Sequence, residues 1–145
     1  MDLQETYEMA RRQMDEKGLT DWTFDFDRSV RRFGVCNYRK RLISMSEKLV
    51  LLNGFDQVFN TLMHEIAHAL VGYHAGHGPV WKEKAQSLGC NGERCYSSEE
   101  VVMPTPKYEG TCEKCGGQRR RNRMKVGAKY YHRGCGGQIN YRRTR

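Results

Sequence analysis

The sequence lacks any uninterrupted apolar run of the roughly 18–20 residues that a membrane-spanning helix requires. Its first residues, MDLQETYEMARRQMDEKG, alternate charged with apolar side chains and so lack the apolar core of a secretory signal. These absences exclude a membrane-spanning protein and argue against secretion. We therefore expect a soluble protein inside the cell, either cytoplasmic or associated with the nucleus or nucleoid.

Proline is also scarce, with three residues in a chain of 145. Two of them, Pro104 and Pro106, fall together in the segment VVMPTPKYEG, where they interrupt regular structure. The length suits one domain with a small appendage, and 38% apolar residues are enough for one buried core. The sequence therefore predicts two parts, residues 1–104 and residues 105–145.

Acidic residues are nearly absent from the end of the chain. From Lys107 to Arg145 there are twelve lysines or arginines against Glu109 and Glu113, a net charge of +10. Residues 1–106 hold thirteen basic and fifteen acidic residues, a net charge of −2. This asymmetry indicates a polyanionic partner for the tail, most often a nucleic acid.

The spacing of apolar residues predicts an α+β fold. Helical periodicity indicates helices over residues 2–17 and 56–71, and a proline in the first turn with a glycine after the last favours a third over 79–88. Alternating or β-rich stretches at residues 22–27, 33–38 and 42–45 predict a small three-stranded sheet before the central helix.

The central helix carries the string HEIAH. Its spacing places His64 and His68 one turn apart on one face, where both imidazoles could bind one zinc ion. Glu65 is then placed to take a proton from a water molecule whose pKa zinc lowers toward about 7, and to pass it to a leaving amine. This pattern is typical of metal-assisted peptide hydrolysis.

A catalytic zinc usually has three protein ligands, and two histidines compete for the third position. His74 has the spacing of the metzincin pattern, but Val71 stands where that pattern requires glycine. His77 lies in GHGPVW between two glycines that allow a sharp approach of the backbone. We favour His77. Trp81, four residues later, is expected to pack the third helix onto the core.

The segments RFGVCNYRKRLISMS, HEIAHALVG and AGHGPVWKEKAQSLG together resemble the SprT-like family, which includes the Spartan proteases acting on DNA–protein crosslinks. The resemblance spans about Trp22 to Tyr141. It implies a zincin-like metallopeptidase core, catalysis by Glu65, His77 as third zinc ligand, a C-terminal zinc ribbon, and protein substrates bound or crosslinked to DNA.

Six cysteines are present, and the last three have metal-binding spacing rather than a disulfide pattern. Cys112 and Cys115 form C-x-x-C, and His132 and Cys135 form H-x-x-C after sixteen residues, which predicts a structural zinc site. The similar segments EKCGGQ and RGCGGQ suggest two metal-binding turns, here called knuckles, joined by a hairpin that turns near Gly127. The family usually has four cysteines, so His132 is a departure.

The basic residues between the knuckles are the predicted nucleic-acid contacts. Guanidinium groups bind phosphates without reading the base sequence, and tyrosines stack on unpaired bases. We therefore expect sequence-tolerant DNA binding by Arg119, Arg120, Arg121, Arg123, Lys125 and Tyr130.

Three other cysteines receive structural interpretations. Cys36 alternates within a strand and is expected in the core. Cys90 and Cys95 are five residues apart, which is loose for a knuckle, so a small buried turn is favoured over a further metal site.

We expect a monomeric zinc endopeptidase with one catalytic and one structural zinc ion. The rival hypothesis is a nucleic-acid-binding zinc protein whose peptidase core serves only as a scaffold. The presence of Glu65 argues against it, because a scaffold that only binds metal does not require this carboxylate.

Overall fold

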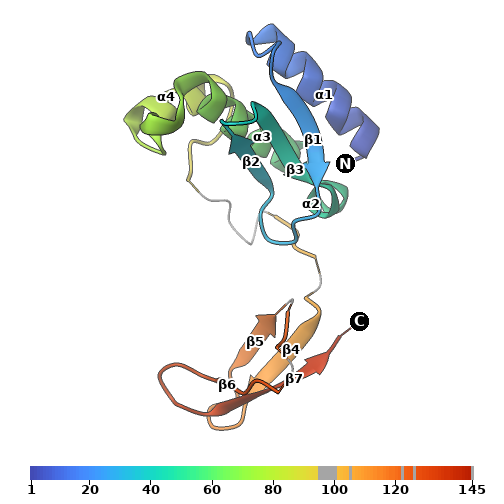
Figure 1. The fold of residues 1–145 in the computed structure, drawn as a ribbon, viewed down its shortest axis with the longest axis vertical. Helices are drawn as coiled ribbons and strands as arrows, with labels where there is room; N and C mark the ends of the chain where they lie inside the picture. Colours follow the sequence, from blue (N-terminus) through green and yellow to red (C-terminus); the bar gives the residue numbers. More distant parts are fainter. Residues whose placement is uncertain (95–100, 105, 122, 126, 145) are drawn as a thin grey trace. The chain divides into compact units, whose positions relative to one another are not determined.

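The computed structural model describes residues 1–94, 101–104, 106–121, 123–125 and 127–144. The chain forms two compact units, Met1–Pro104 and Thr105–Arg145, which we call the N-terminal and C-terminal units. The N-terminal unit combines helices with a three-stranded sheet, and the C-terminal unit is built on a four-stranded sheet (Figure 1). The predicted α+β fold with its small sheet is confirmed.

The first helix, α1 (Leu3–Glu16), begins where Asp2 caps it, since its Oδ1 accepts a hydrogen bond from the backbone N–H of Glu5 at 3.0 Å. Met9, Ala10 and Met14 recur at helical spacing and are buried in the core. The helix ends before Gly18, whose φ of 83° reverses the chain.

The three predicted strands are β1 (Thr23–Asp27), β2 (Gly34–Asn37) and β3 (Leu42–Ser46). They lie in the order β1-β3-β2, with β1 parallel and β2 antiparallel to the central strand. The central strand contributes Ile43 and Met45 to the core. Strand β2 is therefore an edge strand, with one side of its backbone not paired within the sheet.

A short helix, α2 (Glu47–Leu52), follows β3 directly and was not predicted from the sequence. Its start signal is Ser46, whose Oγ accepts a hydrogen bond from the Leu49 N–H at 3.2 Å. The four residues from Leu49 to Leu52 are all apolar, so the sequence shows no helical periodicity there. In the structure only Leu49 and Val50 are buried.

The central helix, α3 (Phe55–Val71), lies behind the sheet in Figure 1 and contacts β2, β3 and α4. It ends at Gly72, which has a φ of 90°. A 3₁₀ turn, η1 (Tyr73–Ala75), then leads to α4 (Pro79–Ser87), whose Trp81 and Ala85 are buried. Among the described residues, no helix has the length and apolarity needed to cross a membrane.

The C-terminal unit contains β4 (Tyr108–Cys112), β5 (Gln118–Arg121), β6 (Tyr130–Tyr131) and β7 (Gln138–Arg143). Their order is β5-β4-β7-β6, so β5 and β6 lie at opposite edges of the sheet. The predicted hairpin around Gly127 is therefore wrong. The chain turns there, but the strands on either side pair with β4 and β7 instead of with each other.

We expect Asn53→Ala to destabilise the N-terminal unit by about 1–3 kcal/mol, because it removes the side-chain partner of the buried Leu49 carbonyl and of the partly buried backbone groups of Val102. The Asn53 amide donates to the carbonyls of Leu49 and Val102 at 2.8 and 2.9 Å and accepts from the Val102 N–H at 2.7 Å. Urea unfolding would measure the change, with Lys48→Ala on the exposed side of α2 as control. Equal stability of the two variants would contradict the role of Asn53.

Candidate active site and metal centres

The imidazole rings of His64, His68 and His77 converge on one point. The Nε2 atom of His64 lies 3.2 Å from that of His68 and 3.1 Å from that of His77, and the remaining pair is 2.9 Å apart. Helix α3 supplies the first two rings one turn apart, and the Gly76–Pro79 turn before α4 supplies the third. The structure thus brings together the three histidines that the sequence singled out.

Hydrogen bonding among the rings cannot satisfy this arrangement. Each neutral ring nitrogen carries either a proton or a lone pair, so at least two of the three must be alike and repel each other. A cation between them satisfies three lone pairs at once. Nitrogen ligands of a tetrahedral zinc lie roughly 3.3 Å apart, close to the spacing found here, so the residues fit a zinc ion.

The protonation of the rings also suits a metal site. Burial, together with the neighbouring imidazoles, lowers the pKa of His64 and of His68 to about 4. Burial and then the charge of Arg94 lower the pKa of His77. All three rings are therefore neutral at neutral pH, the form that binds metal.

The indole ring of Trp81 packs against all three imidazole rings. It is 1% exposed, stacks on the His68 ring at 5.2 Å between centroids, and lies 4.6 Å from the His64 ring and 4.8 Å from the His77 ring. Its indole N–H donates to the His64 carbonyl at 3.3 Å. The prediction that Trp81 packs α4 onto the core is consistent with this burial, but the sequence did not indicate its contact with every ring.

Glu65 lines the same cleft, which has a volume of about 710 Å³. Its side chain is 7% exposed, and burial raises its pKa to about 8 against the opposing effect of Arg32. Strand β2 comes close to this carboxylate because Gly34 has no side chain. A Cβ at that position would lie 2.9 Å from Cγ2 of Thr61 and 3.2 Å from Cγ of Glu65.

His74 does not join the imidazole cluster. It lies in the 3₁₀ turn, is exposed, and packs its ring against Tyr73. The candidate metal group on this part of the described chain comprises His64, His68 and His77. The geometry therefore favours His77 over His74, the ligand that a metzincin pattern would use.

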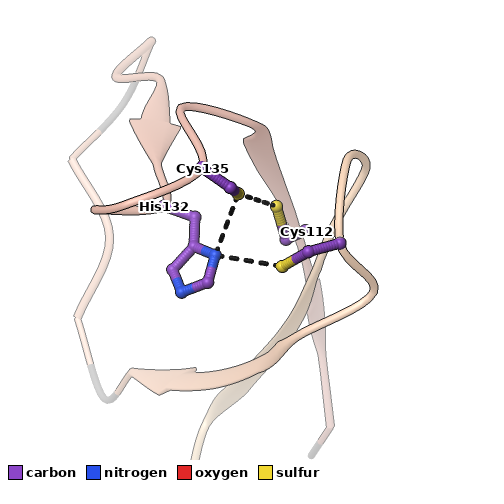
Figure 2. Close-up of side chains that lie close together, drawn as sticks. Cys112, His132 and Cys135 are labelled. Carbon is purple, nitrogen blue, oxygen red and sulfur yellow. Dashed lines mark hydrogen bonds between the residues drawn. The ribbon is translucent and has the colours of Figure 1, made fainter.

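A second group of metal-ligand atoms lies in the C-terminal unit. The atoms offered by Cys112, Cys115, His132 and Cys135 are all within 4.8 Å of one another. Figure 2 shows three of these side chains pointing toward a common centre. The ring presents Nδ1, 3.1 Å from Sγ of Cys115 and of Cys135, while its Nε2 contacts the Arg119 guanidinium.

The two knuckles share one backbone pattern. The Cys112 N–H donates to the Gly117 carbonyl at 2.9 Å, and the His132 N–H donates to that of Gly137 at 2.8 Å. In each knuckle the first glycine has a φ near 74°, with Gly116 at 73° and Gly136 at 74°. The repeated phrase CGGQ thus builds the same turn twice, at the tips of two hairpins.

The apolar core of the C-terminal unit is small. Among its described residues the buried hydrophobic ones are Cys112 and Ile139. A unit of about forty residues with so small a core usually needs a metal or a disulfide. The backbone N–H of Cys115 lowers the pKa of the Cys112 thiol to about 6, which favours the thiolate that zinc binds. These residues also fit a zinc ion.

The predicted nucleic-acid residues do not share one surface. Arg121 places its guanidinium 4.1 Å from the centre of the Tyr130 ring, and Tyr130 packs edge-on against Tyr141 at 5.4 Å. Arg120 and Arg123 are exposed. The backbone N–H of Lys125 donates to the Tyr130 hydroxyl at 3.1 Å. Among the described tyrosines of the C-terminal unit, the exposed one is Tyr131, at 59%, which was not among the residues predicted from the sequence.

The remaining cysteines serve structural roles within the described part of the chain. Cys36 packs against the core, as expected, and also lines the cleft, where burial raises its pKa to about 12. Cys90 is 5% exposed and lies in a turn whose Gly92 N–H points at its sulfur. Cys95 lies outside the described residues.

A sequence model of the SprT-like family matches residues 3–101. The match covers more than half of the chain and includes both histidines of the HEIAH string, its glutamate, and His77. The chain belongs to the SprT-like family. A search among curated proteins found no match.

We expect the purified protein to hold two zinc ions, one for each group of ligand atoms. Cys112→Ser should lose the zinc of the C-terminal unit, and His68→Ala should lose the other. Elemental analysis of the parent and both variants would measure this directly. A parent protein with a single zinc, lost in only one of the two variants, would show that the other group does not bind metal.

Proposed function

We propose that the protein is a zinc-dependent endopeptidase with a zincin-like core, in which His64, His68 and His77 hold the metal and Glu65 is the general base. The observation that carries this proposal is the convergence of three neutral imidazoles beside a buried carboxylate in one open cleft. Membership of a metallopeptidase-related family also supports it.

A zinc ion at this position supplies Lewis-acid chemistry, polarising the scissile carbonyl and acidifying the attacking water. Glu65 takes one proton from that water as its oxygen bonds to the carbonyl carbon. The same carboxyl then returns the proton to the amide nitrogen as the C–N bond breaks, so the proton balance closes within one side chain. Burial alone raises the pKa of Glu65, and a zinc ion held beside it would oppose that shift and favour the carboxylate form, which is the form that accepts the proton.

The edge strand β2 is the proposed binding surface for the substrate backbone. Gly34, Val35 and Cys36 line the cleft, and β2 pairs within its sheet only with β3. An extended peptide could add to the free edge as a further strand. Main-chain pairing of this kind accepts many sequences, which suits a peptidase that acts on varied proteins.

We expect Glu65→Gln to lower peptide hydrolysis by roughly 10²- to 10⁴-fold, the usual contribution of a general base. Glutamine keeps the size of the side chain but cannot accept the proton, so both zinc ions should remain. Cleavage of an unfolded protein substrate, followed with elemental analysis, would measure both properties. Glu83→Gln, on the exposed side of α4, is the matched control.

Full activity in Glu65→Gln would contradict the assigned mechanism. Absence of hydrolysis from the parent, under conditions where zinc is retained and DNA is present, would favour the rival hypothesis of a non-catalytic zinc protein.

We also propose that the C-terminal unit binds DNA without sequence preference and so brings the peptidase to proteins bound or crosslinked to DNA. The net charge of +10 from Lys107 to Arg145 supports this proposal. The strand register divides the basic residues between two faces of the sheet, because side chains alternate along each strand.

One face is better suited to phosphate contact than the other. Arg120 and Arg142 both lie opposite Glu109, and all three share a face with Tyr131. Both arginines and the tyrosine are exposed. On the opposite face, Arg121 stacks on Tyr130, so that ring is partly covered. We therefore place the main DNA contact on the face of Arg120, Tyr131 and Arg142.

Replacing Arg120 and Arg142 together with alanine is expected to weaken binding of a mixed-sequence single-stranded oligonucleotide. The slope of log affinity against log salt should decrease in magnitude by about 1.4, since each lost phosphate contact contributes about 0.7. The double lysine variant keeps both charges and should retain most of the slope. An alanine variant with the parent's slope would contradict this placement of the contact.

A further inference from the structure

A row of three aromatic rings leads from the core of the N-terminal unit to the cleft. Trp22 is half-buried and packs against the core. The Tyr38 ring lies edge-on to it, with 6.5 Å between centroids, and the Tyr73 ring lies edge-on to that of Tyr38 at 5.7 Å. Both tyrosines line the cleft together with the three histidines and Glu65. The row therefore ends inside the proposed active site.

Packing within the chain does not account for the position of Tyr73. Its side chain is 72% exposed, the highest fraction among the exposed large hydrophobic side chains of the described residues. Contact with Tyr38 leaves most of the ring in water, so folding gains little from it. Aromatic side chains left uncovered in a cleft are typical of binding sites, where a ligand covers them.

The backbone around Tyr73 is fixed by hydrogen bonds next to two of the histidines. The Gly72 N–H donates to the His68 carbonyl at 2.9 Å, and the Gly76 N–H donates to the Tyr73 carbonyl at 3.2 Å. Gly72 and Gly76 have φ values of 90° and 51°, so the chain turns sharply on both sides of η1. His77 follows directly. A ring presented from such a turn binds a ligand with less loss of conformational freedom than one on a free loop.

Tyr38 joins this pair of rings to the proposed substrate strand, because it directly follows β2. At the other end of β2, a Cβ on Gly34 would lie 3.2 Å from Cγ of Glu65. Gly34 and Tyr38 are four residues apart. A peptide paired along β2 at about 3.3 Å per residue would therefore reach from the proposed general base to the two rings within roughly four residues.

The surroundings of the rings favour a peptide side chain as the ligand. An aromatic or long aliphatic side chain would remove the apolar faces of both rings from water. Nucleobases also stack on tyrosine. However, the rings lie at the end of a strand edge that is not paired within its sheet, and that edge can pair with a peptide backbone. A peptide can use the edge and the rings together, whereas a nucleotide can use only the rings.

We propose that Tyr38 and Tyr73 form a subsite for an aromatic or long aliphatic side chain of an extended peptide, within about four residues of the scissile bond. This inference rests on the proposed peptidase function. Pairing with β2 accepts many sequences, and the subsite adds a preference at one position. Neither ring takes part in the reaction, so both are specificity-determining residues.

The test is the cleavage-site preference of the full chain on an unfolded protein substrate, mapped by mass spectrometry. The parent is expected to show one position, on one side of the scissile bond, enriched in phenylalanine, tyrosine, tryptophan and leucine. Two peptides that carry phenylalanine or serine at that position should then differ in kcat/KM by roughly 10-fold, the usual effect of partial burial in an open hydrophobic subsite. In Glu65→Gln, their binding affinities, measured by fluorescence anisotropy, should differ by a similar factor.

Tyr73→Ala and Tyr38→Ala are each expected to reduce this preference to about twofold or less, because the apolar contact is lost. Tyr73→Phe keeps the ring and should keep the preference. Tyr7→Ala is the matched control, since it removes a tyrosine that is 43% exposed, lies edge-on to Phe24 at 6.0 Å, and lines a separate hollow on α1.

The possible failures are distinguishable. Hydrolysis without enrichment at any position, or enrichment that persists in Tyr73→Ala, would overturn the inference and leave the proposed function in place. Equal affinity for the two peptides, with binding of a single-stranded oligonucleotide that Tyr73→Ala weakens, would assign the rings to a nucleobase instead. A parent that holds zinc at the histidine site but hydrolyses no peptide would refute the proposed function and this subsite with it.

Discussion

The constraint on which the N-terminal unit depends is the close approach of three ring nitrogens that cannot satisfy one another. The features around them serve to hold this arrangement. The pitch of α3 sets two rings one turn apart, and the glycine-rich turn before α4 brings His77 to meet them. Trp81 then fills the space behind the rings, where a smaller side chain would leave them free to separate.

The two units are stabilised in different ways. The N-terminal unit has a continuous core of buried apolar residues drawn from α1, the sheet, α2, α3 and α4. The C-terminal unit buries few side chains and instead brings four ligand atoms together at the tips of two hairpins. Coordination can replace burial in so small a unit because a bound zinc ion contributes directly to its folding free energy.

The sequence predicted the elements whose patterns are long or contain strong stop signals. Helix α3 could be recognised from its apolar periodicity and from Gly72, and the four ligands of the C-terminal unit from their paired spacing. Helix α2 was missed because its four apolar residues are consecutive. The sequence therefore did not show that Leu49 and Val50 are buried while Leu51 and Leu52 are exposed.

Features that depend on tertiary contact could not be read from the sequence. The approach of Gly34 to Glu65 joins residues thirty-one positions apart, and the hydrogen bond from the Asn91 N–H to the Asn60 side chain joins residues of equal separation. The pairing of β5 and β6 with inner strands was also hidden, because the repeated phrase CGGQ marks the knuckles and not the order of the strands. The division of the arginines between two faces followed only from the register.

The histidine in the second knuckle has an electrostatic consequence. Three thiolates and a neutral imidazole around a divalent cation leave the centre with one negative charge, whereas four thiolates would leave two. The imidazole also turns its outer nitrogen toward Arg119 at the surface, where a cysteine would present only sulfur. With zinc bound, His132 would thus leave the tips of the hairpins less negative by one charge than a cysteine at this position would.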